Sequence, residues 1–261
     1  MLNIVIPMAG RGKRFADVGY LIPKPLIPIH GRPMTQVVIE NLRPSQPHRF
    51  IFLILRDHAN DFQFDDYLQK WVPDCEIIFV ESVTEGAACT VLLARDWINS
   101  DDPLMIANCD QWVDLQIDDY LTAMDFASAD GLIMTMWADD PKWSFARLNS
   151  RGEVTEVVEK KVISNEATVG IYNFRRGRDF VRAAETMIGS NLRVNNEFYV
   201  APTYNQLIAE GQKVVVFNVG KEDQGMYGLG IPADLEKFLL NPISQDAIRR
   251  MSRIHDDTSA H

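Results

Sequence analysis

Residues 2–26 read LNIVIPMAGRGKRFADVGYLIPKPL, and this stretch decides which folds the chain can adopt. It begins with a short apolar strand, residues 2–6, that runs directly into a turn containing Gly10 and Gly12. Glycine has no Cβ, so the backbone of such a turn can come close to a polyanion and direct its N–H groups toward it. A strand followed by this turn predicts a phosphate-binding loop near the N-terminus.

Positive charge beside the turn strengthens this prediction. Lys13 and Arg14 follow the two glycines, and Pro23 and Pro25 hold Lys24 on a stiff extended segment. A stiff segment loses less entropy on binding than a flexible loop does, and ammonium and guanidinium groups bind phosphate oxygens strongly. This arrangement predicts a nucleoside triphosphate as the ligand.

Two better-known phosphate loops do not fit the same stretch. Phe15 occupies the place of the third glycine in the dinucleotide fingerprint, and the chain lacks the Gly-Lys-Ser/Thr run of a P-loop. A plain turn with surface lysines is the remaining alternative.

The run Gly10-x-Gly12-x-Arg14-Phe15 followed by Pro23-Lys24-Pro25-Leu26 resembles the signature of the sugar-1-phosphate nucleotidylyltransferases, also called sugar-nucleotide pyrophosphorylases. The likeness continues through Glu81, residues 86–88, 108–110, 159–160, 169–172, 197–199 and 228–230. It implies an enzyme in which a sugar phosphate attacks the α-phosphate of an NTP and pyrophosphate leaves. It also implies catalytic roles for Arg14 and Lys24 and nucleotide binding by Ala9, Gly10, Gly12 and Lys13.

Composition limits the partners of such a site. The chain has 261 residues, of which 46% are hydrophobic, and its net charge of −10 argues against nucleic acid or an anionic membrane surface as a partner. Residues 11–32 are nevertheless basic, which predicts a local positively charged site on a protein whose net charge is negative. No membrane span or secretion signal is recognisable, so the cytoplasm is the expected location. Oligomeric state is left open, and a homo-oligomer is compatible with the sequence.

Three cysteines, Cys75, Cys89 and Cys109, are unevenly spaced and odd in number. This suits neither a disulfide framework nor a zinc cluster, so we expect buried thiols.

Apolar β-rich runs alternate with helical patterns along the first half of the chain. Residues 50–55, 77–80 and 104–107 are almost continuously apolar, which predicts strands buried on both faces. We therefore expect an α/β fold, a three-layer sandwich with a Rossmann-like, mostly parallel central sheet of the GT-A-like nucleotidyltransferase kind. Ligands should bind at the carboxyl ends of its strands.

The second half predicts strands near 131–137, 144–148, 153–158 and 167–174, with helices near 178–188 and 198–209. No linker composition divides the chain, so we expect one nucleotidyltransferase domain over 1–240. Residues 1–130 should form its nucleotide-binding half and residues 131–240 its acceptor-binding half. The polar segment 241–261 predicts a partly helical appendage with a frayed end.

Asn108-Cys109-Asp110 directly follows an apolar strand, so its side chains should emerge at the carboxyl edge of the sheet. Asp110 is the predicted ligand of Mg²⁺, a cation that prefers oxygen donors and triphosphate oxygens.

One departure from the family pattern concerns a second metal-binding aspartate. The family places it in an Asp-x-Gly-Thr run near the C-terminus, whereas this chain has glycine at 228. Another carboxylate could replace it, with Glu197 the first candidate and Asp223 the second. Otherwise Asp110, the triphosphate and water hold the metal, or the chain is a degenerate binding protein.

Glu81 and Gly86 match the family's base-reading pair, in which the first residue is more commonly glutamine. A carboxylate only accepts hydrogen bonds, so it suits the donors of cytosine or guanine better than those of thymine or uracil. We therefore expect CTP first and GTP second. The alternative is that Glu81 caps the helix that begins at Gly86.

The acceptor site is predicted from the second half of the chain. Glu159 and Lys160 resemble a family pair in which the acid holds a sugar hydroxyl and the lysine holds the acceptor phosphate. Gly170 would let the acceptor approach the backbone, and Glu197 with Tyr199 would shape the pocket. A charged surface strand is the alternative.

Two other functions stay open. One is a GT-A-type glycosyltransferase that uses a nucleotide sugar, and the other is a non-catalytic nucleotide-binding module. Residues 85–90 and 197–202 resemble the branch of the family linked to capsule and surface-polysaccharide building blocks, which includes phosphoglutamine cytidylyltransferase. The resemblance does not choose among the phosphorylated acceptors of that branch.

Overall fold

A computed structural model of the chain describes residues 1–258, with side chains described as far as Met251. Within this range one large sheet runs in the order β5-β4-β1-β6-β11-β8-β12-β13-β7, with β9 beside β11 and β10 beside β9. Its strands are β1 (Leu2–Met8), β4 (His48–Leu55), β5 (Glu76–Val80), β6 (Leu104–Ala107), β7 (Gln111–Val113), β8 (Gly131–Trp137), β9 (Ser144–Leu148), β10 (Val154–Glu159), β11 (Glu166–Phe174), β12 (Val214–Glu222) and β13 (Gly225–Gly228). The short strands β2 (Pro28–Ile29) and β3 (Arg32–Pro33) pair separately.

Helices connect these strands and cover the sheet. They are α1 (Lys13–Ala16), α2 (Met34–Asn41), α3 (Arg56–Phe62), α4 (Phe64–Trp71), α5 (Ala87–Leu92), α6 (Arg95–Ile98), α7 (Ile117–Phe126), α8 (Gly177–Gly189), α9 (Tyr204–Ala209), α10 (Pro232–Leu240) and α11 (Ile243–Thr258). Two 3₁₀ turns, η1 (Lys24–Leu26) and η2 (Ala201–Thr203), contain prolines.

The N-terminal part of the sheet is parallel. β1 pairs with β4 and β6, and β4 pairs with β5, all in parallel register. β11 then pairs antiparallel with both β6 and β8, which joins the second half of the chain to the same sheet. The predicted α/β class with a Rossmann-like sheet is confirmed, and the carboxyl ends of β1, β4, β5 and β6 meet at one edge.

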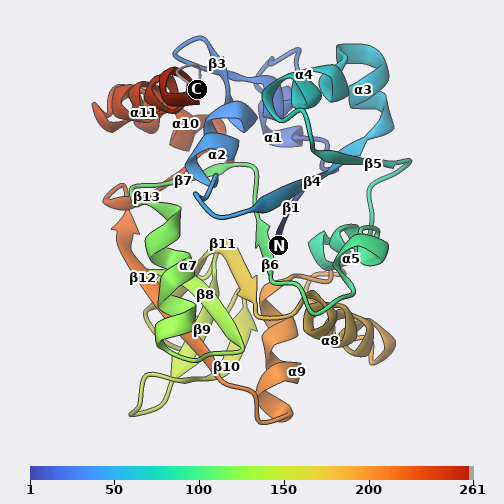
Figure 1. The fold of residues 1–261 in the computed structure, drawn as a ribbon, viewed down its shortest axis with the longest axis vertical. Helices are drawn as coiled ribbons and strands as arrows, with labels where there is room; N and C mark the ends of the chain where they lie inside the picture. Colours follow the sequence, from blue (N-terminus) through green and yellow to red (C-terminus); the bar gives the residue numbers. More distant parts are fainter. Residues whose placement is uncertain (259–261) are drawn as a thin grey trace.

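Period-2 alternation along the strands produces a core on each face of the sheet. In β4, Phe50, Phe52 and Ile54 belong to one apolar cluster, and the alternate residues belong to the other. The first cluster packs under α2, α4, α7, α10 and α11, and the second under α5, α6, α8 and α9. Figure 1 shows α2, α3 and α4 gathered at one end of the molecule and α5 close to α8. This is the three-layer arrangement that the sequence predicts.

Burial corrects two of the sequence predictions. Ile77, Ile78 and Phe79 are only half-buried, because β5 is the edge strand of the sheet and has a neighbour on one side alone. Cys109 is buried, but Cys75 and Cys89 are half-buried, and all three thiols are free.

The predicted appendage contributes to the core. Ala247 and Met251, four residues apart on one face of α11, are buried. Figure 1 shows α10 and α11, in red, beside α2, in blue, and α11 contacts α2. The segment is helical through residue 258, and residues 259–261, at the end that was predicted to fray, lie outside the described residues.

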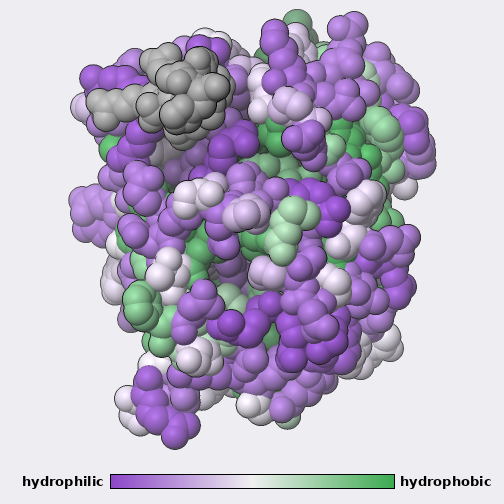
Figure 2. All heavy atoms as spheres, in the orientation of Figure 1, coloured by the Kyte–Doolittle hydropathy of each residue, from purple (hydrophilic) through white to green (hydrophobic). Residues whose placement is uncertain are grey.

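Among the described helices, none combines the length and the apolar character that crossing a bilayer would need. Hydrophilic residues cover most of the face seen in Figure 2, with hydrophobic residues visible between them.

Candidate active site

A cavity of about 550 Å³ opens where β1 and β6 end. It takes residues from the end of β1 and the segment after it, from η1, from the loop after β6, and from three distant segments that contribute Ala87, Glu197 and Gly230. The lining consists of Pro7, Met8, Gly10, Gly12, Lys13, Arg14, Lys24, Pro25, Ala87, Asn108, Cys109, Asp110, Glu197 and Gly230. The sequence segments predicted to bind the triphosphate therefore meet in one place.

Gly12 brings the glycine turn and the Pro23-Lys24-Pro25 segment together. Its φ of +60° lies in the left-handed region, and it precedes the short helix α1. A Cβ on Gly12 would lie 3.1 Å from the Cβ of Lys24, closer than most such contacts. Glycine at this position thus allows both the backbone turn and the close approach of Lys24.

Lys24 forms the main ion pair of the cavity. Its Nζ donates to Asp110 Oδ2 at 2.6 Å, across 86 residues of sequence, and the two side chains are 19% and 22% exposed. Burial acts to lower the pKa of Lys24, but the Asp110 carboxylate outweighs it and holds that pKa above its ordinary value. Lys24 therefore stays charged at neutral pH.

Lys13 and Arg14 differ from Lys24 because both are exposed and neither has an ion-pair partner in the described part of the chain. Their charges are free for an anion in the cavity. Gly10 is open, because a Cβ on it would have no atom within 4 Å. Ala9, predicted to bind the nucleotide, has a buried side chain that packs in the second apolar cluster, and it is not part of the cavity lining.

The neighbourhood of Asp110 limits how a cation can be held. No group of three or more His, Cys, Asp or Glu residues gathers for a metal in the described part of the chain. A lone carboxylate beside a phosphate-sized cavity does fit Mg²⁺, which binds proteins through one or two carboxylates and completes its shell with phosphate oxygens and water. Cys109 is no competitor, because burial raises the pKa of its thiol to about 11.

A second cavity, about 320 Å³, adjoins the first. It contains four of the residues predicted for the acceptor: Glu159, Lys160, Gly170 and Tyr199. Arg14, Ala87 and Asn108 line both cavities, so the two share a boundary.

Two pairs of polar side chains in the second cavity are hydrogen-bonded to each other. Lys160 Nζ donates to the Tyr199 hydroxyl at 2.6 Å, a bond that raises the pKa of Lys160. The Ser144 hydroxyl donates to the Glu159 carboxylate. Burial raises the pKa of Glu159, although the bond from Ser144 and the charge of Lys160 oppose the shift.

Gly170 is the point of closest approach in this cavity. Its φ is +82°, and a Cβ there would lie 2.2 Å from Asn108 Nδ2 and 2.3 Å from Gln111 Oε1. Gly170 O also accepts from the Asn108 N–H at 2.9 Å. Any side chain at 170 would displace the two amides that border the cavities.

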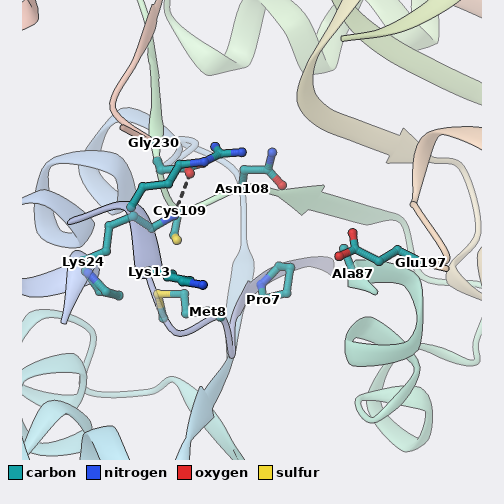
Figure 3. A pocket seen from close by; sticks show the side chains of 14 residues that line it. Pro7, Met8, Lys13, Lys24, Ala87, Asn108, Cys109, Glu197 and Gly230 are labelled. Atoms are coloured by element: carbon teal, nitrogen blue, oxygen red, sulfur yellow. Dashed lines mark hydrogen bonds and ion pairs between the residues drawn. The ribbon is translucent and has the colours of Figure 1, made fainter. Parts of the chain in front are cut away.

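Three predicted residues lie elsewhere than expected. Glu81 pairs with Arg56 Nε at 2.6 Å, is 70% exposed, and lines neither cavity. Gly86 lines neither cavity, and a Cβ on it would lie 2.5 Å from the backbone of Phe198. Glu197, predicted for the acceptor, lines the first cavity, and Figure 3 shows it with Ala87 across from Lys24 and Gly230.

Tyr172, in the family-like run 169–172, lines the second cavity together with several residues that the sequence did not single out. The residues not singled out are Gln111, Lys142, Trp143, Ser144 and Thr168. Ser144 lies directly opposite Glu159 in the β9–β10 pair. Only the strand register could have revealed this contact, and the register was not readable from either strand alone.

The chain is similar in sequence and in fold to known proteins. The sequence profile of the family described as nucleotidyl transferase matches residues 4–229. The chain is 27% identical to the bifunctional protein GlmU of Herminiimonas arsenicoxydans, over 99% of this chain and 55% of that protein. The chain spans about half the length of the curated relatives it matches.

Solved structures show the same fold. The nucleoside-diphosphate-sugar pyrophosphorylase from Vibrio cholerae RC9 superposes with a TM-score of 0.76 at 24% identity, covering 91% of this chain and all of that one. The inositol-1-phosphate CTP transferase from T. maritima superposes with a TM-score of 0.70 at 15% identity, covering 95% of each chain.

Proposed function

The chain belongs to the nucleotidyl transferase family, and on that basis we propose that it joins an NTP to a sugar phosphate or a similar phosphorylated acceptor. The observation that carries the proposal is the boundary between the two cavities, which Arg14, Ala87 and Asn108 share. A triphosphate in the first cavity and a phosphorylated acceptor in the second would meet there. Most of the first cavity comes from residues 1–130, the proposed nucleotide-binding half.

The proposed reaction needs no covalent enzyme intermediate. An oxygen of the acceptor phosphate forms a bond to the α-phosphorus, the bond from that phosphorus to the bridging oxygen breaks, and pyrophosphate leaves with that electron pair. Lys24, Lys13 and Arg14 would offset the negative charge of the triphosphate. Lys160, held by Tyr199, would orient the acceptor phosphate for in-line attack.

Mg²⁺ is part of the proposal, with Asp110 as its protein ligand. When bound, it would neutralise charge on the transferring phosphoryl group. The Lys24–Asp110 pair means that Lys24 has to share the carboxylate with the cation or turn toward the phosphates.

For the base, we propose CTP first and GTP second. Support comes from Glu81, whose carboxylate accepts hydrogen bonds from the amino group of cytosine or the N–H groups of guanine. Glu81 follows β5, and its carboxylate accepts a hydrogen bond from Arg56 Nε. Glu81→Gln adds a donor, so it should move relative turnover from CTP toward UTP; an unchanged order of the four NTPs would remove Glu81 from base selection.

A matrix of the four NTPs against phosphorylated acceptors, read out as pyrophosphate release with Mg²⁺, tests the function. Release that requires both substrates is expected. Hydrolysis or transfer from a nucleotide sugar would favour a glycosyltransferase, and nucleotide binding without turnover would favour a non-catalytic module. Acceptors of the capsule and surface-polysaccharide type should be the best substrates, as the resemblance of residues 85–90 and 197–202 suggests.

A further inference from the structure

Three residues line both cavities and so form their boundary: Arg14, Ala87 and Asn108. Ala87 offers only a methyl group, and Arg14 is exposed and has no ion-pair partner in the described part of the chain. The Asn108 side chain differs from both, because its Nδ2 donates to Gln111 Oε1 in a long hydrogen bond of 3.4 Å. A substrate atom at the boundary would therefore meet an amide that already has a place in the structure.

Backbone contacts and packing fix where this amide lies. Asn108 directly follows β6, and its N–H donates to Gly170 O on β11 at 2.9 Å. The Asn108 and Gln111 amides lie together over Gly170, where a Cβ would collide with both. Gln111 is 8% exposed, and the residue that faces it across the β13–β7 pair is Gly228, so no side chain from that position competes for its space.

The Asn108 amide keeps a donor for a ligand. Its Nδ2 carries two N–H groups, of which one is directed to Gln111 and the other has no partner in the described part of the chain. Figure 3 shows the Asn108 side chain between Gly230 on one side of the first cavity and Ala87 on the other. A neutral donor suits this place, since a carboxylate would repel phosphates and an alkyl group would leave a phosphate oxygen without a hydrogen bond.

We propose that Asn108 is a catalytic residue that donates a hydrogen bond from Nδ2 to a non-bridging oxygen of the α-phosphate, and that Gln111 is the positioning residue that orients this amide. The inference rests on the proposed function for its choice of a nucleoside triphosphate. Attack on the α-phosphorus places additional negative charge around that phosphorus. A donor already in place there stabilises the transition state without reorganisation.

Binding of α-thio NTPs tests the contact without turnover, because no acceptor is added. Sulfur accepts hydrogen bonds more weakly than oxygen does, and the Rp and Sp diastereomers replace different non-bridging oxygens. Isothermal titration calorimetry with Mg²⁺ gives Kd for both diastereomers and for the parent NTP that the wild-type chain binds most tightly. Loss of the bond from Asn108 should weaken the binding of one diastereomer by about tenfold more than that of the other, the value of a hydrogen bond to a charged group.

Asn108→Leu removes the donor and nearly keeps the size of the side chain. It should weaken binding of the parent NTP by ~10-fold and reduce the preference between the diastereomers by the same factor. A preference caused by the metal would stay in both proteins. Asn99→Leu is the matched control, because Asn99 is exposed and lines neither cavity, and it should change each Kd by less than about twofold.

Two further variants separate contact from structural support. Asn108→Asp keeps the shape of the side chain but replaces the donor by a carboxylate, so it should weaken NTP binding more than Asn108→Leu does, whereas a purely structural role predicts the reverse order. Gln111→Leu should reduce the diastereomer preference in part, and it should have no further effect on that preference when Asn108 is already leucine.

An unchanged diastereomer preference in Asn108→Leu, or milder loss in Asn108→Asp than in Asn108→Leu, would overturn the inference. An additive effect of Gln111→Leu would remove Gln111 from the proposal. Pyrophosphate release by the wild-type chain is measured separately with the panel of acceptors. If no acceptor supported release while the preference still depended on Asn108, the proposed function would be rejected and the contact between Asn108 and the α-phosphate would stand.

Discussion

The two adjoining cavities differ in the state of their charges. In the first, Lys13 and Arg14 are exposed and unpaired within the described residues, and Lys24 has one partner, Asp110. In the second, Lys160 is already bonded to Tyr199, and Glu159 to Ser144. The first cavity therefore offers unsatisfied charge to a polyanion, whereas among the described residues of the second only Arg14, at the shared boundary, is an unpaired cation, and Lys160 and Lys142 are held by Tyr199 and Glu222. We infer that electrostatic attraction dominates nucleotide binding and that preorganisation dominates acceptor binding.

The largest effect should come from the first cavity. Lys24→Ala removes a half-buried, charged donor and should lower kcat by ~10²-fold, the usual loss for one preorganised electrostatic donor. Pyrophosphate release at saturating substrates measures this. Arg11→Ala is the matched control, because Arg11 precedes Gly12 but lines neither cavity and pairs loosely with Asp57 at 3.9 Å. Equal losses in both variants would mean that only the local charge matters.

The next largest effect should be a difference in stability between glycine substitutions in the two cavities. Gly12→Ala should cost about 1 kcal/mol for its left-handed φ, and Gly170→Ala about 3 kcal/mol, since a Cβ there also displaces Asn108 and Gln111. Urea unfolding gives both free energies. Gly152→Ala, at φ +77° with nothing within 4 Å, isolates the cost of φ alone. If Gly170→Ala were no worse than Gly152→Ala, the second cavity would not be as tightly packed as described.

A smaller effect should arise where Lys160 meets Tyr199. Tyr199→Phe keeps the ring but removes the hydroxyl, and it should raise KM for the acceptor by roughly fivefold, the value of about one hydrogen bond. Steady-state kinetics with each substrate varied in turn distinguish the cavities. In Tyr199→Phe, KM for the NTP should stay the same. The control is Tyr67→Phe on the remote helix α4, which should leave KM for the acceptor and KM for the NTP unchanged. A matching rise in KM for the NTP would contradict separate roles.

The smallest effect concerns pH and Glu159. Burial raises the pKa of this carboxylate above its ordinary value of 4.5, so the folded protein loses stability as pH rises through the folded pKa. Glu159→Gln cannot ionise, and its gain in melting temperature over the wild type should be larger at pH 7 than at pH 4. Glu156 lies on the same strand as Glu159 and forms an exposed ion pair with Arg147 of β9. Glu156→Gln should therefore show a smaller change in melting temperature between the two pH values. A gain in melting temperature that is the same at both pH values would show that burial of the charged carboxylate is not its cause.

What the sequence could predict depended on local chemistry. The glycine turn, the stiff lysine segment and the strand that ends before Asn108 are each readable from neighbouring residues, and all three meet in the first cavity. The strand boundaries at 104–107 and 131–137 follow from continuous apolar runs.

The remaining features depend on contacts between distant segments. Ser144 opposite Glu159 is a matter of strand register, and the partial burial of β5 is a matter of sheet order. The burial of Ala247 and Met251 depends on α2, some two hundred residues earlier, and the overall polarity of residues 241–261 concealed their spacing. Glu81 was assigned from its match to the family's base-reading pair, but its carboxylate accepts a hydrogen bond from Arg56, which no local pattern shows.

A crystal structure of the chain with Mg²⁺ and the α,β-methylene analogue of CTP tests the central claim most directly. We predict that triphosphate oxygens lie within about 3 Å of the Gly12 N–H, the Arg14 guanidinium and Lys24 Nζ, at hydrogen-bonding distance. The α-phosphate should then face the boundary lined by Arg14, Ala87 and Asn108. A nucleotide bound elsewhere, with these three groups far from its phosphates, would contradict the account.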